Sequence, residues 1–176
     1  MTLYDPLSFI YVLEGPDHAG KTTTAKQISD VARHEGHNVQ CVHFGPSTGM
    51  TSYTLFEQYV SAVAKAAWES VTSNTVTIFD RLHVGEWVYG NIIRHHSLLT
   101  LDQIIAIDQM LSSVGAKKFH VTARNSTLQE RHLKLGDDYI SKDELRVIQQ
   151  QYIDMLKNPR FQDWHVLDTT FTVAPS

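Results

Sequence analysis

Cysteine is almost absent from the sequence, since Cys41 is the only one among 176 residues. A single cysteine excludes an intramolecular disulfide and is typical of a reducing compartment. No apolar run approaches the roughly 20 residues that a membrane-spanning helix needs. The first residues also lack the basic-then-apolar pattern of a signal peptide. We therefore expect a cytoplasmic protein without a membrane segment.

A strong excess of either charge is also lacking. The formal net charge is −4, the isoelectric point is near 6.2, and the basic residues are scattered along the chain. Proteins that bind nucleic acid or anionic membranes gather Lys and Arg into patches, so we expect neither kind of partner. The hydrophobic fraction of 42% in a chain of this length suits one globular domain over residues 1–176.

The most informative stretch is Gly15–Thr22, which has the pattern G-x-x-x-x-G-K-[ST]. It follows the apolar run 9–13 and precedes a helical segment, and this context gives the pattern a mechanism. Glycines let successive N–H groups turn inward around an anion, and the following helix N-terminus adds further donors. Lys21 would reach the β- and γ-phosphates of ATP, and the Thr22 hydroxyl would bind Mg²⁺. The residues expected to bind the nucleotide phosphates are Gly15, His18, Ala19, Gly20, Lys21, Thr22 and Thr23.

Hydrophobic periodicity and turn residues divide the chain into alternating strands and helices. We predict strands at 9–14, 39–44, 75–79, 118–123 and 164–168, with helices at 20–35, 51–72, 84–94 and three later segments. Those three helices should begin at the capping patterns of Thr100, Ser126 and Ser141. Such alternation predicts a parallel α/β sheet with helices on both faces, and ligands gather at the carboxyl ends of its strands. Cys41 should be a small core residue, and the apolar stripe of helix 51–72 should run as far as Trp68 and Val71.

A second group of polar residues follows the third strand. Asp80 resembles a Walker B acid, which would hold Mg²⁺, and Arg81 can present two N–H groups to a phosphate. The alternative is a structural ion pair that closes the strand end. Farther along, Glu86, Tyr89 and Arg94 lie on one helical segment. Tyr89 either stacks on a base or packs in the core, and the same choice applies to Phe44 after strand two.

Two stretches, Leu13–Thr23 and Asp80–Gly90, resemble the thymidylate kinases, and more closely the compact deoxynucleoside monophosphate kinases of bacteriophages. Glu130-Arg131 and the following 136–140 are similar to that group's shortened lid, expected at about 131–140. The resemblance implies the P-loop NTPase fold, with a five-stranded parallel sheet in the order 2-3-1-4-5. It also implies a homodimer through helix faces, as is frequent in the family, and the host's cytoplasm if a phage encodes the chain.

The resemblance also implies roles for individual residues. Asp17 would contact the sugar hydroxyl of the acceptor, and the Asp80–Arg81 pair would hold its phosphate. Arg94 falls on the acceptor side, and Arg131 falls where an arginine lies over the adenine of ATP. The resulting catalytic set is Lys21, Arg81, Asp80 and Asp17, with Thr22 and Asp80 for Mg²⁺. The resulting acceptor site is Asp17, Phe44, Arg81, Glu86, Tyr89 and Arg94.

The chain departs from the family at several positions. Thymidylate kinases carry an arginine in the P-loop or the lid, but here the P-loop has His18 and the lid has Lys134 between two leucines. We expect either a slower enzyme or compensation by Lys134, Arg124 or a protonated His18. Gly90 stands where a polar base-reading group often lies, so the resemblance does not identify the base.

These residues together predict a deoxynucleoside monophosphate kinase, which transfers the γ-phosphoryl of ATP to dTMP or a related or modified pyrimidine nucleotide. One alternative is a kinase for a hydroxyl group, on a deoxynucleoside or a hydroxymethylated base, with Glu14 as the general base. Another is an ATPase or nucleotide-binding module without an acceptor. The motifs of guanine-specific switch proteins do not occur in the sequence.

Overall fold

The structure is a computed structural model of the chain that describes residues 3–45, 47, 49–136 and 140–171. Its elements are β1 Ile10–Glu14, α1 Lys21–His34, β2 Asn38–His43, α2 Ser52–Thr72, β3 Thr75–Asp80, α3 His83–Ile93, α4 Leu101–Ser113, β4 Lys117–Thr122, α5 Asn125–Leu135, α6 Lys142–Leu156 and β5 Trp164–Asp168. Each predicted strand and helix is present, with ends that differ by a few residues at most.

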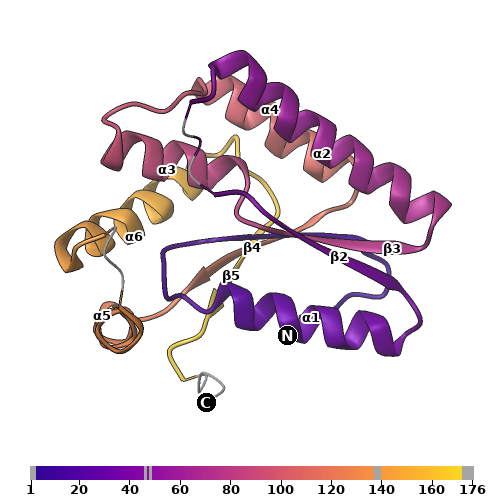
Figure 1. Cartoon of the computed structure of the whole chain (residues 1–176), viewed down its shortest axis with the longest axis horizontal. Helices are drawn as coiled ribbons and strands as arrows, with labels where there is room; N and C mark the ends of the chain where they lie inside the picture. Colours follow the sequence, from indigo (N-terminus) through magenta and orange to yellow (C-terminus); the bar gives the residue numbers. More distant parts are fainter. Residues whose placement is uncertain (1–2, 46, 48, 137–139, 172–176) are drawn as a thin grey trace.

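The five strands form one parallel sheet in the order β2-β3-β1-β4-β5 (Figure 1). This arrangement confirms the fold class and the strand order that the resemblance implied. The central strand β1 is buried along its whole length, as its continuous apolar sequence predicts. Register places Leu13 beside Asp80 on β3 and Glu14 beside His120 on β4, so polar groups from three strands meet at one end of the sheet.

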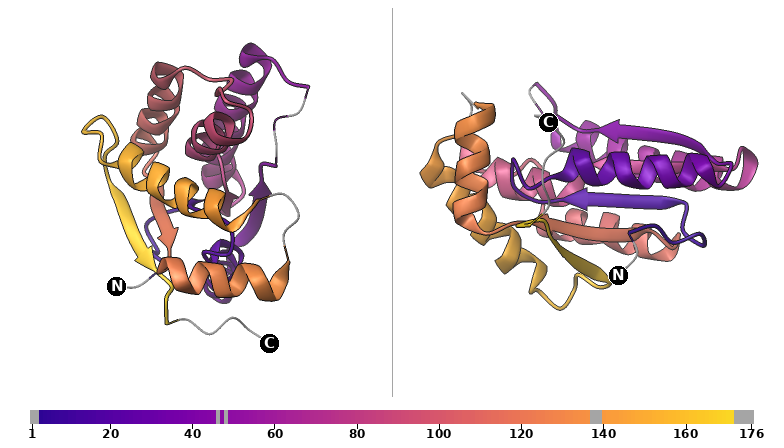
Figure 2. Two further views of the ribbon diagram at one scale, coloured as in Figure 1. Left: turned by 90° about the vertical axis from the view of Figure 1, so that its left-hand side faces the viewer. Right: turned by 90° about the horizontal axis from the view of Figure 1, so that it is seen from below.

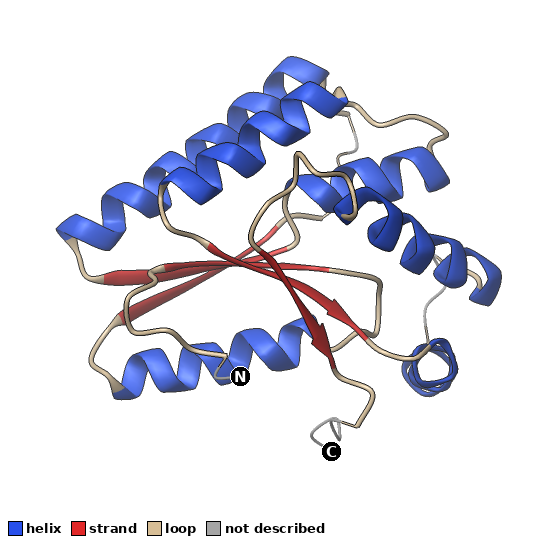
Figure 3. Cartoon of the chain, turned by 180° about the vertical axis from the view of Figure 1, so that it is seen from behind, coloured by secondary structure: helices blue, strands red, loops and turns tan. Residues whose placement is uncertain are grey.

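Helices cover both faces of the sheet. α1 lies on one face, and α2 and α4 lie together on the other (Figures 1 and 3). α3 and α6 lie next to each other, with α5 beside α6 (Figure 2). The loop from β1 to α1 therefore opens toward the side of the molecule where α3, α5 and α6 gather.

Helix starts follow the predicted capping patterns in two of three cases. Thr100 and Ser141 each form a reciprocal capping box with the residue three positions later. The expected cap at Ser126 is wrong: α5 already begins at Asn125, and its N-cap residue Arg124 makes no side-chain capping bond. Because α5 begins at Asn125, shortly after the end of β4 at Thr122, Ser126 lies inside the first turn of the helix.

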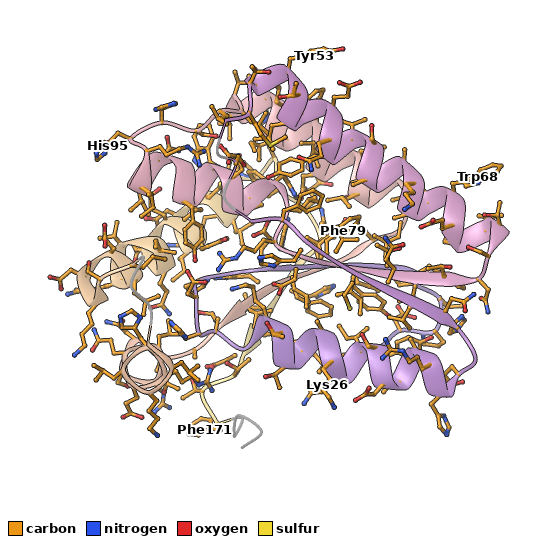
Figure 4. The ribbon with its side chains drawn as sticks, viewed as in Figure 1. Lys26, Tyr53, Trp68, Phe79, His95 and Phe171 are labelled. Carbon is orange, nitrogen blue, oxygen red and sulfur yellow. The ribbon has the colours of Figure 1, made fainter. Side chains whose placement is uncertain are left out.

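Two expectations about burial are also wrong. Cys41 is exposed, because β2 is an edge strand with one neighbour. On α2, Trp68 and Val71 are exposed, and Figure 4 shows Trp68 projecting outward while Phe79 of β3 lies inside. The buried line of α2 ends at Ala66, and at about 100° per residue Trp68 falls on the opposite side of the helix.

The lid that the resemblance implies at about 131–140 lies only partly within the described residues. Residues 131–135 belong to α5, and 137–139 lie outside the described residues. No helix within the described part of the chain is long and apolar enough to cross a membrane.

Beneath the carboxyl end of β1, the Glu14 carboxylate is completely buried. Its Oε1 accepts hydrogen bonds from the backbone N–H groups of Leu82 (2.9 Å) and Gly85 (3.1 Å), and its Oε2 accepts one from the Tyr152 hydroxyl (3.1 Å). Two of the otherwise unpaired donors at the N-terminus of α3 are thereby satisfied. Glu14 therefore fixes the start of α3, directly after Arg81.

His120 lies beside this group, with its ring stacked on Tyr152 at 5.7 Å between centroids. Burial, reinforced by the charge of Lys21, lowers the pKa of His120 from 6.5 to about 4. The unfolded chain therefore binds a proton at this position below pH 6.5, while the folded chain stays neutral down to about pH 4. The protein should lose stability as the pH falls through this window.

We predict that replacing His120 with Phe, which keeps the ring stack, removes this dependence. In the native protein, the titration of His120 should lower the free energy of unfolding by up to about 1.4 kcal/mol for each unit by which the pH falls across that window. Urea unfolding of both proteins between about pH 4.5 and 7 measures the difference in slope. Identical slopes would show that His120 is not the titrating group.

Candidate nucleotide and acceptor site

The loop between β1 and α1 turns tightly against the neighbouring strand β4. Gly15 has a φ of 149°, and a Cβ at this position would lie 2.0 Å from the carbonyl oxygen of Val121. Gly20 has a φ of 92° and is the N-cap of α1. Both glycines of the motif are therefore required, one by the approach to β4 and the other by its left-handed backbone.

Lys21 is the first residue of α1 and is buried against this loop. Its ammonium group donates to the carbonyl oxygens of Gly15 (3.0 Å) and Pro16 (2.7 Å). Burial, together with the charge of Arg81, lowers the pKa of Lys21 to about 8, although Asp17, Asp80 and Glu14 act in the opposite direction. A phosphate that replaced the two carbonyls would compensate this desolvated charge more strongly.

Asp80 and Thr22 meet at the end of β3. The Thr22 hydroxyl lies 3.5 Å from Oδ2 of Asp80, and Nδ1 of His43 lies 3.5 Å from the same oxygen. Oδ1 of Asp80 is buried without a hydrogen-bond partner among the described residues. A hydroxyl and a carboxylate oxygen that lacks a donor are suitable ligands for Mg²⁺, which prefers oxygen. The residues present therefore fit the metal expected from the sequence.

Arg81 follows with a φ of 66°, an uncommon conformation for a residue with a side chain. Its guanidinium pairs with Oδ1 of Asp17 and lies over the ring of Tyr89, 4.5 Å from the centroid. The Tyr89 hydroxyl donates to Oδ2 of Asp17 at 2.8 Å. Burial alone would raise the pKa of Asp17, but the charges of Arg81 and Lys21 and the Tyr89 hydrogen bond lower it below the usual value. Asp17 and Arg81 thus face each other as a charged pair.

Two cavities meet at this pair. The first, of about 360 Å³, is lined by the loop, the start of α1, Asp80 and α5. The second, of about 330 Å³, is lined by the turn after β2, by α2 and by α3. The residues common to both linings are Asp17, His43 and Arg81. Two neighbouring ligands would therefore meet at the Asp17–Arg81 pair.

Most of the residues expected from the sequence line one or both of these cavities. The first is lined by Asp17, His18, Gly20, Lys21, Thr22, Thr23, Asp80, Arg81 and Arg131. The second is lined by Asp17, Phe44, Arg81, Glu86, Tyr89 and Arg94. Gly15 and Ala19 belong to neither described lining: Gly15 packs against Val121 of β4, and Ala19 is completely buried. Tyr89 and Phe44, for which packing and ligand contact were both open, border the second cavity while also touching other aromatic rings.

Sequence reasoning missed two residues of the site. Thr169, just after β5, is buried, and its hydroxyl donates to the carbonyl of Ala19 at 2.7 Å. His43, the last residue of β2, borders both cavities. His43 is at the carboxyl end of a strand and Thr169 directly follows one, and this is the signal that could have identified them.

The structure also bears on the missing arginine. Arg131 lines the first cavity, where Nη1 donates to the His18 carbonyl at 3.0 Å and Nη2 donates to the Thr169 carbonyl at 2.7 Å. His18 lies in the same lining, with its ring 5.2 Å from that of His132. Lys134 and Arg124 are outside both linings as far as the described residues show. Of the three groups expected to compensate, only His18 is therefore at the cavity.

No protein-family model and no curated protein sequence matches the chain. Solved structures do. The YorR protein of Bacillus subtilis, in complex with phosphorylated GDP, is 23% identical over 91% of this chain and 85% of its own, with a TM-score of 0.70. A deoxyadenosine kinase from M. mycoides with bound dATP is 15% identical over 90% of each chain, with a TM-score of 0.51. A thymidylate kinase from Candida albicans is 16% identical over 94% of this chain and 85% of its own, with a TM-score of 0.51. The chain has the fold of P-loop kinases.

We predict that Gly15→Ala abolishes nucleotide binding and destabilises the protein by about 3 kcal/mol, because the new Cβ meets the Val121 carbonyl. Gly36→Ala is the matched control. Gly36 also has a positive φ, of 85°, but a Cβ there would meet no atom within 4 Å, so its cost should be only about 1–2 kcal/mol. Urea unfolding and ATP calorimetry measure both effects, and equal losses in the two variants would contradict the close-approach argument.

Proposed function

We propose that the chain is a nucleoside monophosphate kinase, which transfers the γ-phosphoryl of ATP to the α-phosphate of a deoxynucleoside monophosphate. The acceptor is dTMP or a related or modified pyrimidine nucleotide. The observation that carries this proposal is the pair of cavities that share Asp17, His43 and Arg81. An ATPase needs only the first cavity, whereas phosphoryl transfer between two nucleotides needs both.

The kinds of residue that line each cavity support the roles of the two cavities. Lys21, Gly20 and Thr22 border the first, as the phosphates of ATP require, and Arg131 borders it as well. In the second, Phe44 and Tyr59 provide aromatic rings for a base. Arg81 lies where the two meet, so it would hold the acceptor phosphate toward the γ-phosphate of ATP. In this step an oxygen of the acceptor phosphate forms a bond to the γ-phosphorus, and the bond to the β–γ bridging oxygen breaks to release ADP.

The protein contributes alignment and charge to this reaction, because phosphoryl transfer passes through a loose transition state. Lys21 donates to the donor phosphates, and Arg81 leaves Asp17 for the acceptor phosphate. Asp17 is then free to accept a hydrogen bond from the acceptor's sugar. Mg²⁺ held by Thr22 and Asp80 would neutralise phosphate charge. No general base is needed, since the second pKa of a phosphate monoester is about 6 and the acceptor is largely dianionic at neutral pH.

We predict that Lys21→Ala and Arg81→Ala each reduce turnover by about a thousandfold or more, because Lys21 neutralises charge on the ATP phosphates and Arg81 positions the acceptor phosphate that attacks them. Arg81→Lys should recover only part of the loss, since lysine keeps the charge but not the two-pronged geometry. The assay is ADP release with ATP and, in turn, dTMP, dUMP, hydroxymethyl-dUMP, dCMP, dGMP and dAMP. ADP release that needs no acceptor would favour the ATPase, and unchanged turnover in a variant would remove that residue from its role.

The kinase for a hydroxyl acceptor depended on Glu14 as general base, and its position gives this alternative little support. Both carboxylate oxygens accept hydrogen bonds from α3 or Tyr152, and Glu14 is not among the described residues that line the cavities. We predict that Glu14→Gln lowers the melting temperature but keeps turnover within about threefold, because a general base contributes a hundredfold or more. The hydroxyl kinase would be favoured instead if the native protein phosphorylated free deoxynucleosides and the Glu14→Gln variant were stable but inactive.

A further inference from the structure

Arg94, which follows α3, turns back along the helix instead of extending into solvent. Its backbone N–H donates to the carbonyl of Gly90 at 3.0 Å, as in a last helical turn. Its guanidinium pairs through Nη2 with Oε1 of Glu86, two turns earlier. Side chains on a helix point toward its N-terminus, so the path of the Arg94 side chain crosses position 90.

Gly90 is the residue that leaves this path open. A Cβ there would lie 2.8 Å from Nη2 of Arg94, 3.0 Å from Cα of Ser97 and 3.1 Å from Oε1 of Glu86. The first distance is too short for a real contact. Gly90 lies inside α3 in a backbone conformation that any residue can adopt, and glycine is a poorer helix former than alanine. Its role is therefore the space that it leaves, both for the guanidinium of Arg94 and for the backbone at Ser97.

Glu86 is a fixed anchor for this guanidinium. Its side chain is only 2% exposed. Besides Arg94, its Oε1 accepts the backbone N–H of Leu98 at 2.9 Å, and its Oε2 accepts the hydroxyl of Ser47 at 3.0 Å. Arg94 lies at the end of α3, Leu98 lies in the segment before α4, and Ser47 follows β2. The carboxylate therefore cannot follow Arg94 if the arginine is displaced.

Arg94 is only partly covered by the protein. Its Nε is buried and has no hydrogen-bond partner among the described residues, so a ligand can reach only the exposed part of the side chain. The side chain is 27% exposed and lines only the second cavity, whereas Asp17 and Arg81 line both. A ligand whose phosphate lies at Arg81 would therefore present a more distant part, its base, to Arg94.

We propose that Gly90 and Glu86 are positioning residues for base recognition: Glu86 anchors the Arg94 guanidinium, and the missing side chain of Gly90 lets it reach that anchor. Arg94 then donates to an acceptor atom on the base. The inference depends on the proposed function for the identity of the ligand.

The test compares Gly90→Ala, Glu86→Gln, Arg94→Ala and the double variant Gly90→Ala/Arg94→Ala with the native protein. Glu57→Gln, at an exposed position of α2, is the matched control for the charge change. For each protein the KM of ATP and of the best acceptor, kcat and the melting temperature are measured. Calorimetric binding is measured for dTMP, dCMP, dGMP and dAMP.

Loss of one positioned guanidinium contact should raise the KM of the acceptor about tenfold in each single variant, with little change in the KM of ATP. Preference between dTMP and dCMP, which differ in the group at ring position 4, should narrow. Gly90→Ala should raise the acceptor KM no further once Arg94 is absent, because the side chain that it displaces is gone. A lower melting temperature should remain, since the new Cβ still lies 3.0 Å from Cα of Ser97. Glu57→Gln should match the native protein.

An acceptor KM that is unchanged in Gly90→Ala, or a second full loss in the double variant, would overturn the inference. A fall in melting temperature with both KM values rising together would also overturn it, since that result describes a packing defect. If the native protein transfers phosphate to no acceptor, the proposed function fails, and binding of the four nucleotides then decides the inference by the same comparisons. Binding of none of them by the native protein would overturn both.

Discussion

The close approach of the main chain at Gly15 to strand β4 is the constraint on which the site depends. Because the Val121 carbonyl occupies the place of a Cβ, the chain leaves β1 in a direction that a residue with a side chain could not take. That direction brings Lys21 onto the first turn of α1 and directs the loop toward the end of β3. The carboxyl ends of β1 and β3 then face one cavity from two sides. The shape of the candidate site is thus a consequence of how two neighbouring parallel strands pack.

Several charges at this site are held away from water before any ligand is present. Burial brings the pKa of Lys21 down to about 8, while the pKa of Asp17 stays low because the charges of Arg81 and Lys21 and the hydrogen bond from Tyr89 outweigh its burial. Arg81 is paired with Asp17 and covered by Tyr89. Such preorganised groups reduce stability in the free protein but interact strongly with phosphate, since little solvent competes with them. The buried charges of the site therefore lower the stability of the free protein, and only an anionic ligand would compensate them fully.

A separate buried network supports the start of α3 from below. Asp108 of α4 accepts from Lys118 of β4 at 2.9 Å and from the Trp164 ring nitrogen of β5 at 2.9 Å, and His83 lies 3.3 Å from it. The His83 and Asp108 side chains are almost completely buried. With Glu14 on the other side, this network holds the segment that follows Arg81 and its uncommon backbone conformation. None of these contacts could be inferred from the sequence, because each joins residues from different elements.

The sequence by itself determined the glycine-flanked loop between β1 and α1, the alternation of strands and helices and the capping of α4 and α6, since these depend on short-range spacing and periodicity. It also brought Asp80, Arg81 and the loop together, because parallel strands place their carboxyl ends at one edge. Only the tertiary structure decided that Cys41 faces solvent, that Thr169 lies beneath the loop, and that Arg94 folds over Gly90 onto Glu86. These outcomes depend on which elements become edges and which side chains meet across them, and packing sets both.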